Sequence, residues 1–456
     1  MSLLGAYNPG MNAPVHVVGG GLAGCECAWQ LASRGVEVVL WEMRPAATTP
    51  AHRTDRLAEL VCSNSLRSDD PHHPSGLLKR EMESLGSLVL RAARAEAVPA
   101  GSALAVDRDR FAAAVTASLE GHPRVEIRRE ELRDLPARDV VVASGPLTSP
   151  ALSSRLAELL GAEHLYFYDA ISPVIEAESL DRGRLFAASR YGKGGGDDYL
   201  NAPMDRERYV AFRAAILAAE VLPLRDFERA LFFEGCLPIE ELARRGEDTL
   251  RFGPMKPVGL RAPDGSRPWA VVQLRQENLA RSQYSLVGFQ SRLCWPDQRR
   301  VLRMIPGLGR ADFVRLGQVH RNTFVNAPLH LDACYRLRAL PRVRLAGQIT
   351  GVEGYLESAA TGLAAALYLV LERRGEAFVT LPPTTAIGAL ARHLTESDPA
   401  RFQPANVNYG LFPALPGRAS RGDRRAALAA RAATDLASWS AAHGVTLERD
   451  QARRAG

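Results

Sequence analysis

The chain has 456 residues, of which 46% are hydrophobic and 24% are charged, and these ordinary globular values exclude a disordered or fibrous protein. The length fits two or three domains at roughly 150 residues each. A balance of 57 basic against 51 acidic side chains leaves a formal charge of +6, which permits a polyanionic partner without requiring one.

The first predicted unit is a strand, a glycine loop, a helix and a second strand. Residues 15–18 form a short β-branched run that is typical of a buried parallel strand. The run leads into Gly19, Gly20, Gly21, Leu22, Ala23 and Gly24. The segment CECAWQLASRG then predicts a helix that ends at Gly35, and residues 36–41 predict a second strand that is followed by Glu42.

This arrangement predicts a dinucleotide site. Glycines let the backbone approach a pyrophosphate, and the helix N-terminus offers N–H groups and the positive end of its dipole. Glu42, which follows the second strand, can accept hydrogen bonds from a ribose. The alternative is a tight structural turn without a ligand, but the strand before the loop and the helix after it favour the dinucleotide site.

Two later segments repeat the pattern of a strand followed by glycine. Residues 139–143 read as a buried strand before Ser144, Gly145 and Pro146, and residues 343–346 lead into Gly347 and Gln348 ahead of an apolar helix. We therefore predict an α/β fold, in which a Rossmann-type, doubly wound parallel sheet is interrupted by an inserted α+β domain. The predicted parts are 14–190, 191–335 for the insertion, and 336–456.

The end of the chain is rich in arginine. Residues 418–456 contain eight arginines and four acidic residues. Two interpretations stay open, a solvated alanine-rich surface helix with a frayed tail and a patch that contacts phosphates.

Cysteine spacing and the N-terminus exclude several classes of protein. No C-x-x-C or zinc-ligand spacing occurs, and the few cysteines do not form a disulfide framework, so we expect reduced thiols and no metal. We see no signal peptide and no run of about 18 apolar residues, so we expect a cytoplasmic protein that does not bind a membrane.

Two cysteines lie in surroundings that suggest chemistry. Cys62 follows the first β-α-β unit, where loops at the carboxyl ends of the strands lie close to a bound dinucleotide, and Cys236 lies in the insertion. A thiolate becomes a strong nucleophile where positive charge lowers its pKa. Each cysteine, taken alone, is more often a buried and inert thiol.

Longer segments carry a family resemblance. These segments are GGGLAG with LWEMRP, ELVCSNSLRSDD, RYGKGGGDDYLNAPM, FFEGCLPIEELARRGEDTLRFGPMKPVGL, LVGFQSRLCWPDQRRVLRMIPGL, VHRNTFVNAP, LAGQITGVEGYLESAATGL, TTAIGALARHLT and NVNYGLFPAL. They closely resemble the corresponding segments of the folate- and FAD-dependent tRNA uracil-5-methyltransferases, the TrmFO family. The resemblance extends from Val15 to about Leu415. The stretch AGQITGVEGYLESAATGL is also similar to the related GidA (MnmG) flavoproteins, which modify the wobble uridine of tRNA.

The resemblance implies a function and a set of site residues. It implies FAD on the glycine loop, NADH or NADPH as the reductant, methylenetetrahydrofolate as the one-carbon donor, and conversion of a T-loop uridine of tRNA to ribothymidine without an obligate protein partner. Gly145, Pro146, Gly347 and Gln348 match segments that line the flavin. Cys62 and Cys236 match the two cysteines implicated in catalysis. His320, and less strongly Trp295, match the folate pocket.

Several alternatives stay open at the level of sequence. Either cysteine could form the adduct with uracil. A GidA-like modification of the wobble uridine, an FAD oxidoreductase of small molecules and a tRNA-folding chaperone that keeps FAD for structure are the rival functions.

Overall fold

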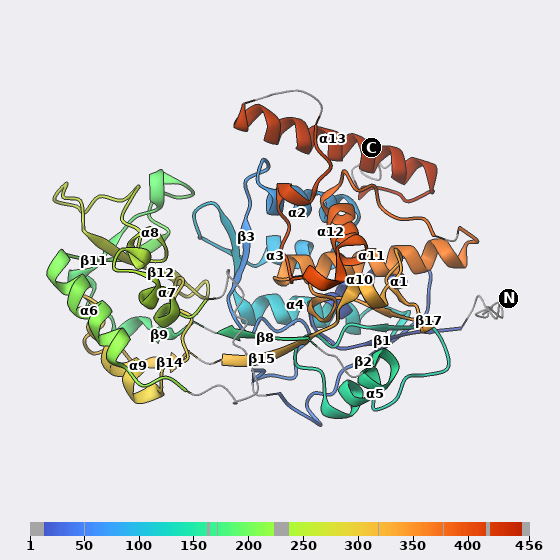
Figure 1. Cartoon of the computed structure of the whole chain (residues 1–456), viewed down its shortest axis with the longest axis horizontal. Helices are drawn as coiled ribbons and strands as arrows, with labels where there is room; N and C mark the ends of the chain where they lie inside the picture. The colour runs from blue at the N-terminus through green and yellow to red at the C-terminus, as the bar shows by residue number, and fades with distance from the viewer. Residues whose placement is uncertain are drawn as a thin grey trace.

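The computed structural model describes residues 13–49, 51–161, 165–170, 172–222, 237–317, 319–376, 378–415 and 420–448. For 165–170, 319–323 and 421–422 it describes the backbone alone. Two bodies lie side by side, and a small sheet of β8 (Leu165–Ala170) and β15 (Val319–Phe324) lies between them (Figure 1).

The first body is built on a six-stranded sheet. Its order is β16 (Arg336–Leu337), β17 (Leu340–Leu345), β7 (Val140–Val142), β1 (Val15–Val18), β2 (Val38–Trp41) and β6 (Val125–Arg128), and all neighbours are parallel except β16 and β17. Strand β17 lies beside β7 although some 200 residues of chain separate them in the sequence. The strands predicted at 15–18, 36–41, 139–143 and 343–346 are thereby confirmed, and so is the interrupted Rossmann-type fold.

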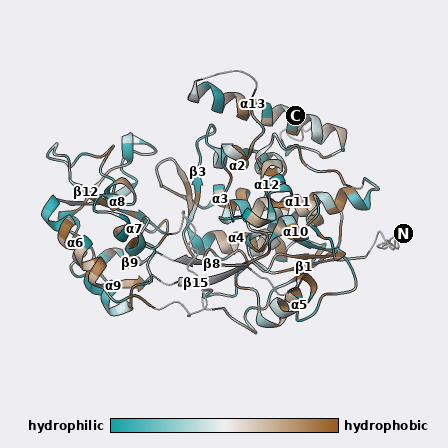
Figure 2. Cartoon of the chain, viewed as in Figure 1, coloured by the Kyte–Doolittle hydropathy of each residue, from teal (hydrophilic) through white to brown (hydrophobic). Residues whose placement is uncertain are grey.

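The helices of this body pack on the sheet and on one another. They are α1 (Leu22–Ala32), α2 (Pro74–Ser84), α3 (Leu88–Ala95), α4 (Arg108–Glu120), α5 (Pro150–Leu160), α10 (Ala327–His330), α11 (Tyr355–Arg373), α12 (Ala386–Glu396) and α13 (Arg421–Ala442), of which α13 packs on α2. A three-stranded sheet, in the order β3 (Ser65–Ser68), β5 (Ala103–Val106) and β4 (Ala97–Val98), extends the body toward its neighbour. Figure 2 shows hydrophobic stretches along β1 and the inner helices.

The second body contains an antiparallel sheet with its own hydrophobic core. The sheet has the order β10 (Phe186–Ala187), β11 (Tyr199–Met204), β12 (Ala270–Gln276), β13 (Gln283–Leu286), β9 (Val174–Glu176) and β14 (Phe313–Arg315). Its helices are α6 (Arg206–Ala218), α7 (Ile239–Arg245), α8 (Thr249–Phe252) and α9 (Trp295–Leu302). The sheet includes β9 and β10, which precede residue 191, and the boundaries at 190 and 335 stay predictions.

Hydrogen bonds join the two bodies. Strands β8 (Leu165–Ala170) and β15 (Val319–Phe324) pair in antiparallel fashion where the chain passes between them. The Tyr199 hydroxyl of β11 donates to the Ala100 carbonyl at 2.8 Å, and Arg275 of β12 donates to the Asn64 side chain at 2.8 Å. The segment that follows the first β-α-β unit therefore lies at the contact between the bodies. No helix within the described residues has the length and apolar character needed to cross a membrane.

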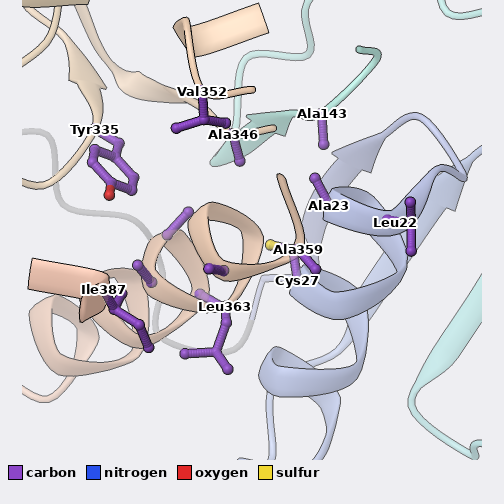
Figure 3. Close-up of a cluster of buried hydrophobic side chains, with 14 of the residues drawn as sticks. Leu22, Ala23, Cys27, Ala143, Tyr335, Ala346, Val352, Ala359, Leu363 and Ile387 are labelled. Atoms are coloured by element: carbon purple, nitrogen blue, oxygen red, sulfur yellow. The ribbon is translucent and has the colours of Figure 1, made fainter. Parts of the chain in front are cut away.

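Small residues bring α1 and α11 together. Figure 3 shows Ala23 and Cys27 of α1 facing Ala359 and Leu363 of α11. A Cβ added at Gly362 would lie 2.1 Å from the Ala23 carbonyl oxygen, so only glycine fits at this crossing. Cys25 and Cys27 are fully buried, and burial raises the pKa of both thiols, which agrees with a packing role.

Candidate active site

A pocket opens at the carboxyl ends of the parallel strands. It has a volume of about 1040 Å³ including its open mouth, and its wall comes from loops that follow β1, β2, β7 and β17. Ligands of open α/β sheets bind in this position. Ten of the eleven predicted cofactor residues line the pocket, namely Gly19, Gly20, Gly21, Leu22, Ala23, Glu42, Gly145, Pro146, Gly347 and Gln348.

The glycine loop and the N-terminus of α1 form one wall. Gly21 precedes the helix, no side chain caps the first turn, and no described atom lies within 4 Å of the position that a Gly21 Cβ would take. Gly24 does not line the pocket, because it faces inward, where a Cβ would lie 1.8 Å from the Gly19 carbonyl oxygen. Gly24 therefore permits close packing of helix on strand, while the other glycines leave room for a pyrophosphate.

Glu42 holds the glycine loop in place. Its Oε2 accepts from the Gly20 amide at 2.9 Å, and Arg44 donates to both oxygens through Nε at 2.9 Å and Nη2 at 3.1 Å. The Arg44 amide donates to Oε1 at 3.0 Å, so the protein already occupies the four lone-pair directions of this carboxylate. Burial opposes the charge of Glu42, but Arg44 and the Gly20 amide outweigh it and lower the pKa of Glu42. A ribose hydroxyl would replace one of these donors.

The opposite wall comes from distant segments. Gly145 and Pro146 follow β7, and Gly347 and Gln348 follow β17. The Gly347 amide donates to the Thr361 hydroxyl at 2.7 Å, which fixes this loop to α11. These four residues and the glycine loop, far apart in the sequence, therefore line one pocket that fits a dinucleotide cofactor.

Residues 60–62, called the Cys62 segment below, run along the edge of the pocket. Val61 and Tyr355 line it, and the Cys62 amide donates to the Tyr355 hydroxyl at 2.5 Å. Cys62 is half-buried, so its thiol is not enclosed in the core. Cys62 itself is not among the residues that line the pocket, but its neighbour Val61 and its hydrogen-bond partner Tyr355 are.

Two arginines hold the carbonyl groups of this segment. Arg108 of α4 donates to the Cys62 carbonyl at 3.1 Å, and Arg315 of β14 donates to the same oxygen at 3.0 Å. Arg108 is paired with Glu277, whose side chain is 4% exposed, through an Nε–Oε2 contact of 2.5 Å. Burial opposes the charge of Arg108, but Glu277, Tyr355 and Cys62 outweigh it and raise the pKa of Arg108.

The remaining predicted residues do not complete the site. Cys236 lies outside the described residues. His320 is on β15 opposite Asp169 of β8, and the structure describes its backbone alone. Trp295 begins α9 in the second body, is 49% exposed and is not among the residues that line the pocket. The roles of these three residues stay predictions.

Sequence reasoning missed the charged residues that hold the site. Arg44 stands two residues after Glu42 in LWEMRP, and this short spacing could have indicated the pair. Arg108 and Arg315 meet at Cys62 from segments that are far apart in the chain, so no local pattern marks them. Tyr355 is the first residue of α11, and its contact with Cys62 depends on the same tertiary arrangement.

Comparison with known proteins identifies the family. The family model for glucose inhibited division protein A matches residues 14–377. The methylenetetrahydrofolate--tRNA-(uracil-5-)-methyltransferase TrmFO of Geobacter sulfurreducens is 57% identical over 94% of this chain and 99% of its own length. The protein of the same name from Paramagnetospirillum magneticum is 53% identical over 94% of this chain and 99% of its own length.

A solved structure supports the fold. The structure of Aquifex aeolicus GidA in the form II crystal has a TM-score of 0.68 and 16% sequence identity, and the match covers 96% of this chain and 75% of that one. The fold is therefore shared with GidA, while the sequence is far more similar to the TrmFO proteins. The chain belongs to the TrmFO family, and it carries the GidA family match over most of its length.

Proposed function

We propose that this protein methylates carbon 5 of the T-loop uridine of tRNA to give ribothymidine, with methylenetetrahydrofolate as the carbon donor. The observation that carries the proposal is the near-full-length identity of 57% to a protein named as this methyltransferase. The pocket supports it, because a one-carbon unit at the oxidation level of methylene must gain two electrons to become a methyl group, and a redox cofactor in this pocket would supply them. FAD is that cofactor, and NADH or NADPH is its reductant.

The residues that would hold FAD follow from the pocket. The uncapped N-terminus of α1 and the glycine loop suit the pyrophosphate, and the Glu42 region suits the ribose. Gly145, Pro146, Gly347 and Gln348 line the other wall. When bound and reduced, FAD supplies the two electrons that a methylene group needs to become a methyl group.

The protein's own part begins with a cysteine. Carbon 5 of uracil is a poor nucleophile, and addition of a thiolate at carbon 6 makes it electron-rich. The sulfur–carbon bond breaks again when the proton on carbon 5 has left. Cys62 and Cys236 are the candidates for this role and for handling the one-carbon unit or a proton, and His320 and Trp295 are the candidates for contact with folate.

The substrate must also reach the pocket. A uridine within the folded T-loop is stacked, so it must leave the stack before its carbon 5 can approach the cofactor. The formal charge of +6 suits contact with phosphates.

A reconstitution assay tests the proposal. The purified protein is incubated with methylenetetrahydrofolate, NADH or NADPH and unmodified tRNA, and the nucleosides are then analysed. We expect ribothymidine, and we expect it to be lost in Cys62→Ala and in Cys236→Ala. Full activity in both variants would exclude the cysteine mechanism, and absence of ribothymidine with a flavin-loaded protein would exclude the function.

A GidA-like modification of the wobble uridine is the second candidate. The GidA family match and the shared fold favour it. The identity to solved GidA is only 16%, against 57% to a TrmFO protein, so the first function is better supported. Formation of ribothymidine in the T-loop without any other protein separates the two.

A further inference from the structure

The Cys62 segment is held by guanidinium groups from both bodies. Arg108, in the first body, donates to the Leu60 carbonyl at 2.8 Å and the Cys62 carbonyl at 3.1 Å. Arg315, in the second body, donates to the Val61 carbonyl at 2.8 Å and the Cys62 carbonyl at 3.0 Å. Two cations therefore converge on one peptide group beside the pocket.

The charges around this peptide do not balance. Glu277 is the carboxylate that pairs with Arg108, and the groups with the largest electrostatic effect on Arg315 are Arg108, Glu277, Cys62 and Tyr355. The nearby Arg275 is bound to the neutral side chains of Asn64 and Ser63. Among these groups, the three guanidinium charges outnumber the Glu277 carboxylate.

Burial and the surplus positive charge both lower the pKa of Arg315. Burial and the neighbouring Arg108 lower the pKa of Arg315 to about 10, so the side chain remains charged at neutral pH at a cost in free energy. An anion nearby would reduce that cost. Of the neutral groups that interact electrostatically with Arg315, Cys62 and Tyr355 can become anions, and a thiol ionises at lower pH than a phenol.

We propose that Arg108 and Arg315 act as positioning residues that hold Cys62 in its thiolate form. At neutral pH the thiol proton passes to solvent water, and the sulfur keeps the electron pair with which it attacks an electrophilic carbon. Because Arg315 belongs to the second body, the reactivity of Cys62 depends on the contact between the bodies. This inference deepens the proposed function, since it rests on Cys62 as the reacting thiol of that function.

Alkylation by iodoacetamide measures the thiolate directly. The sulfur–carbon bond forms while the carbon–iodine bond breaks and iodide leaves, and peptide mass spectrometry of the flavin-loaded protein follows Cys62 by itself. In Arg315→Gln we expect the midpoint of the rate against pH to rise by about one unit, which is about tenfold slower alkylation at pH values well below the wild-type midpoint. In Arg315→Lys, which keeps the charge, we expect a midpoint close to that of the wild type.

Glu277→Gln provides a test of the opposite sign. It removes the neutralising carboxylate with little change in shape, so the Cys62 midpoint should fall. Loss of stability alone would not move the midpoints of Arg315→Gln and Glu277→Gln in opposite directions. If Arg315→Gln fails to fold, the shift in Glu277→Gln still decides.

Two controls report on general effects. Arg292→Gln removes a half-buried arginine of the second body that is paired with Glu241, and it should leave the Cys62 profile unchanged. Cys294 is the internal reference for the variants of Arg315 and Glu277, since its neighbours are the acids Glu220 and Asp297, and its profile should be the same in those variants.

Three results would overturn the proposal. They are an unchanged Cys62 midpoint in folded Arg315→Gln, an equal rise in Arg315→Lys, and a Glu277→Gln midpoint that is unchanged or higher. The assay contains no tRNA and no folate, so its outcome is independent of methyl transfer. A protein that shows the predicted profiles but forms no ribothymidine would contradict the proposed function and leave the thiolate assignment standing.

Discussion

At the scale of single residues, the site depends on carboxylates and guanidinium groups whose hydrogen bonds and ion pairs are formed within the protein. The side chains of Glu42 and Arg44 are both buried, and Nη1 of Arg44 also lies 3.0 Å from Oε2 of Glu59. A buried pair of this kind contributes geometry more than net stability, because desolvation offsets much of the attraction. Removing one partner is costly, since the other is left with an uncompensated charge.

We expect Glu42→Gln to weaken flavin binding by about tenfold or more, because an amide cannot accept from Gly20 and from both ends of Arg44. Flavin retention during dialysis, read from the visible absorbance, measures the change. Glu37→Gln, at an exposed position before the same strand, is the control and should retain flavin. Equal retention in the two variants would contradict the role of Glu42.

The pH dependence of Glu42 has a definite sign. Its pKa in the folded protein lies below the ordinary value of 4.5, so its contribution to stability is complete above pH 4.5. The contribution is lost as the pH falls below that value toward the folded pKa. We expect the melting temperatures of the wild type and Glu42→Gln to converge below pH 4.5, and a constant difference down to pH 3 would contradict this.

At the scale of elements, the crossing of α1 and α11 sets the position of the glycine loop. The loop leads directly into α1, and α11 begins with Tyr355 at the pocket. Small side chains let the two helices approach closely, as Figure 3 shows for Ala23 and Ala359. The packing of two buried helices therefore determines the geometry of the cofactor wall.

Gly362→Ala tests this packing. The new Cβ would lie 2.1 Å from a backbone oxygen that cannot move away, so we expect a loss of about 2 kcal/mol or more in the free energy of unfolding. Chemical denaturation measures the loss. Gly309→Ala has open space at its Cβ position and should change stability little, and a similar loss in both variants would exclude the packing explanation.

A buried carboxylate links α2 to α12. Glu81 accepts from the amides of Ala386 and Ile387 at 2.7 and 3.0 Å, yet burial raises the pKa of Glu81 to about 8. Because the folded pKa is raised, the contribution of Glu81 to stability is complete below its ordinary value of 4.5 and is lost as the pH rises through 8.

Glu81→Gln should therefore remove a pH-dependent loss of stability. We expect the melting temperature of the wild type relative to this variant to decline between about pH 5 and pH 8. Glu83→Gln, which changes a residue on the same helix that is 34% exposed, is the matched control and should not alter this decline. A difference between wild type and Glu81→Gln that does not vary with pH would show that Glu81 does not titrate in this range.

At the scale of the whole molecule, charge is distributed unevenly. Helix α13 lies across one side of the first body (Figure 1) and buries Leu428, Ala432 and Leu436 against it. Arg431 donates to the Pro413 carbonyl at 2.6 Å, whereas Arg424 is exposed and Arg425 is half-buried. The helix is thus anchored by an apolar face, which fits the interpretation as a surface helix and leaves Arg424 and the exposed part of Arg425 available for phosphate.

We expect tRNA binding to weaken with salt, because each phosphate contact releases counterions. Even two or three contacts predict a loss of about tenfold between about 50 and 200 mM salt. Filter binding at several salt concentrations measures the slope, and a flat response would contradict a phosphate-dominated interface. A shallower slope in the double variant Arg424→Gln and Arg425→Gln would assign α13 to phosphate contact, and an unchanged slope would assign it to the solvated surface.

The sequence by itself determined the interrupted parallel sheet and the cofactor pocket. Short β-branched strands followed by glycine, as at 15–18 with Gly19 and at 343–346 with Gly347, are local patterns, and the parallel order follows from the crossover helix. The family resemblance added the function, which the comparisons support.

Only the tertiary structure decided which charges surround Cys62. Arg108 and Arg315 belong to different bodies and are far apart in the chain, and Tyr355 reaches the same peptide from α11. Electrostatic environment is a sum over neighbours in space, so a pattern along the chain cannot contain it. The same reason explains why Gly24 was predicted at the pocket and is found beneath it, since the side on which a glycine makes its close contact depends on the packing of α1 on β1.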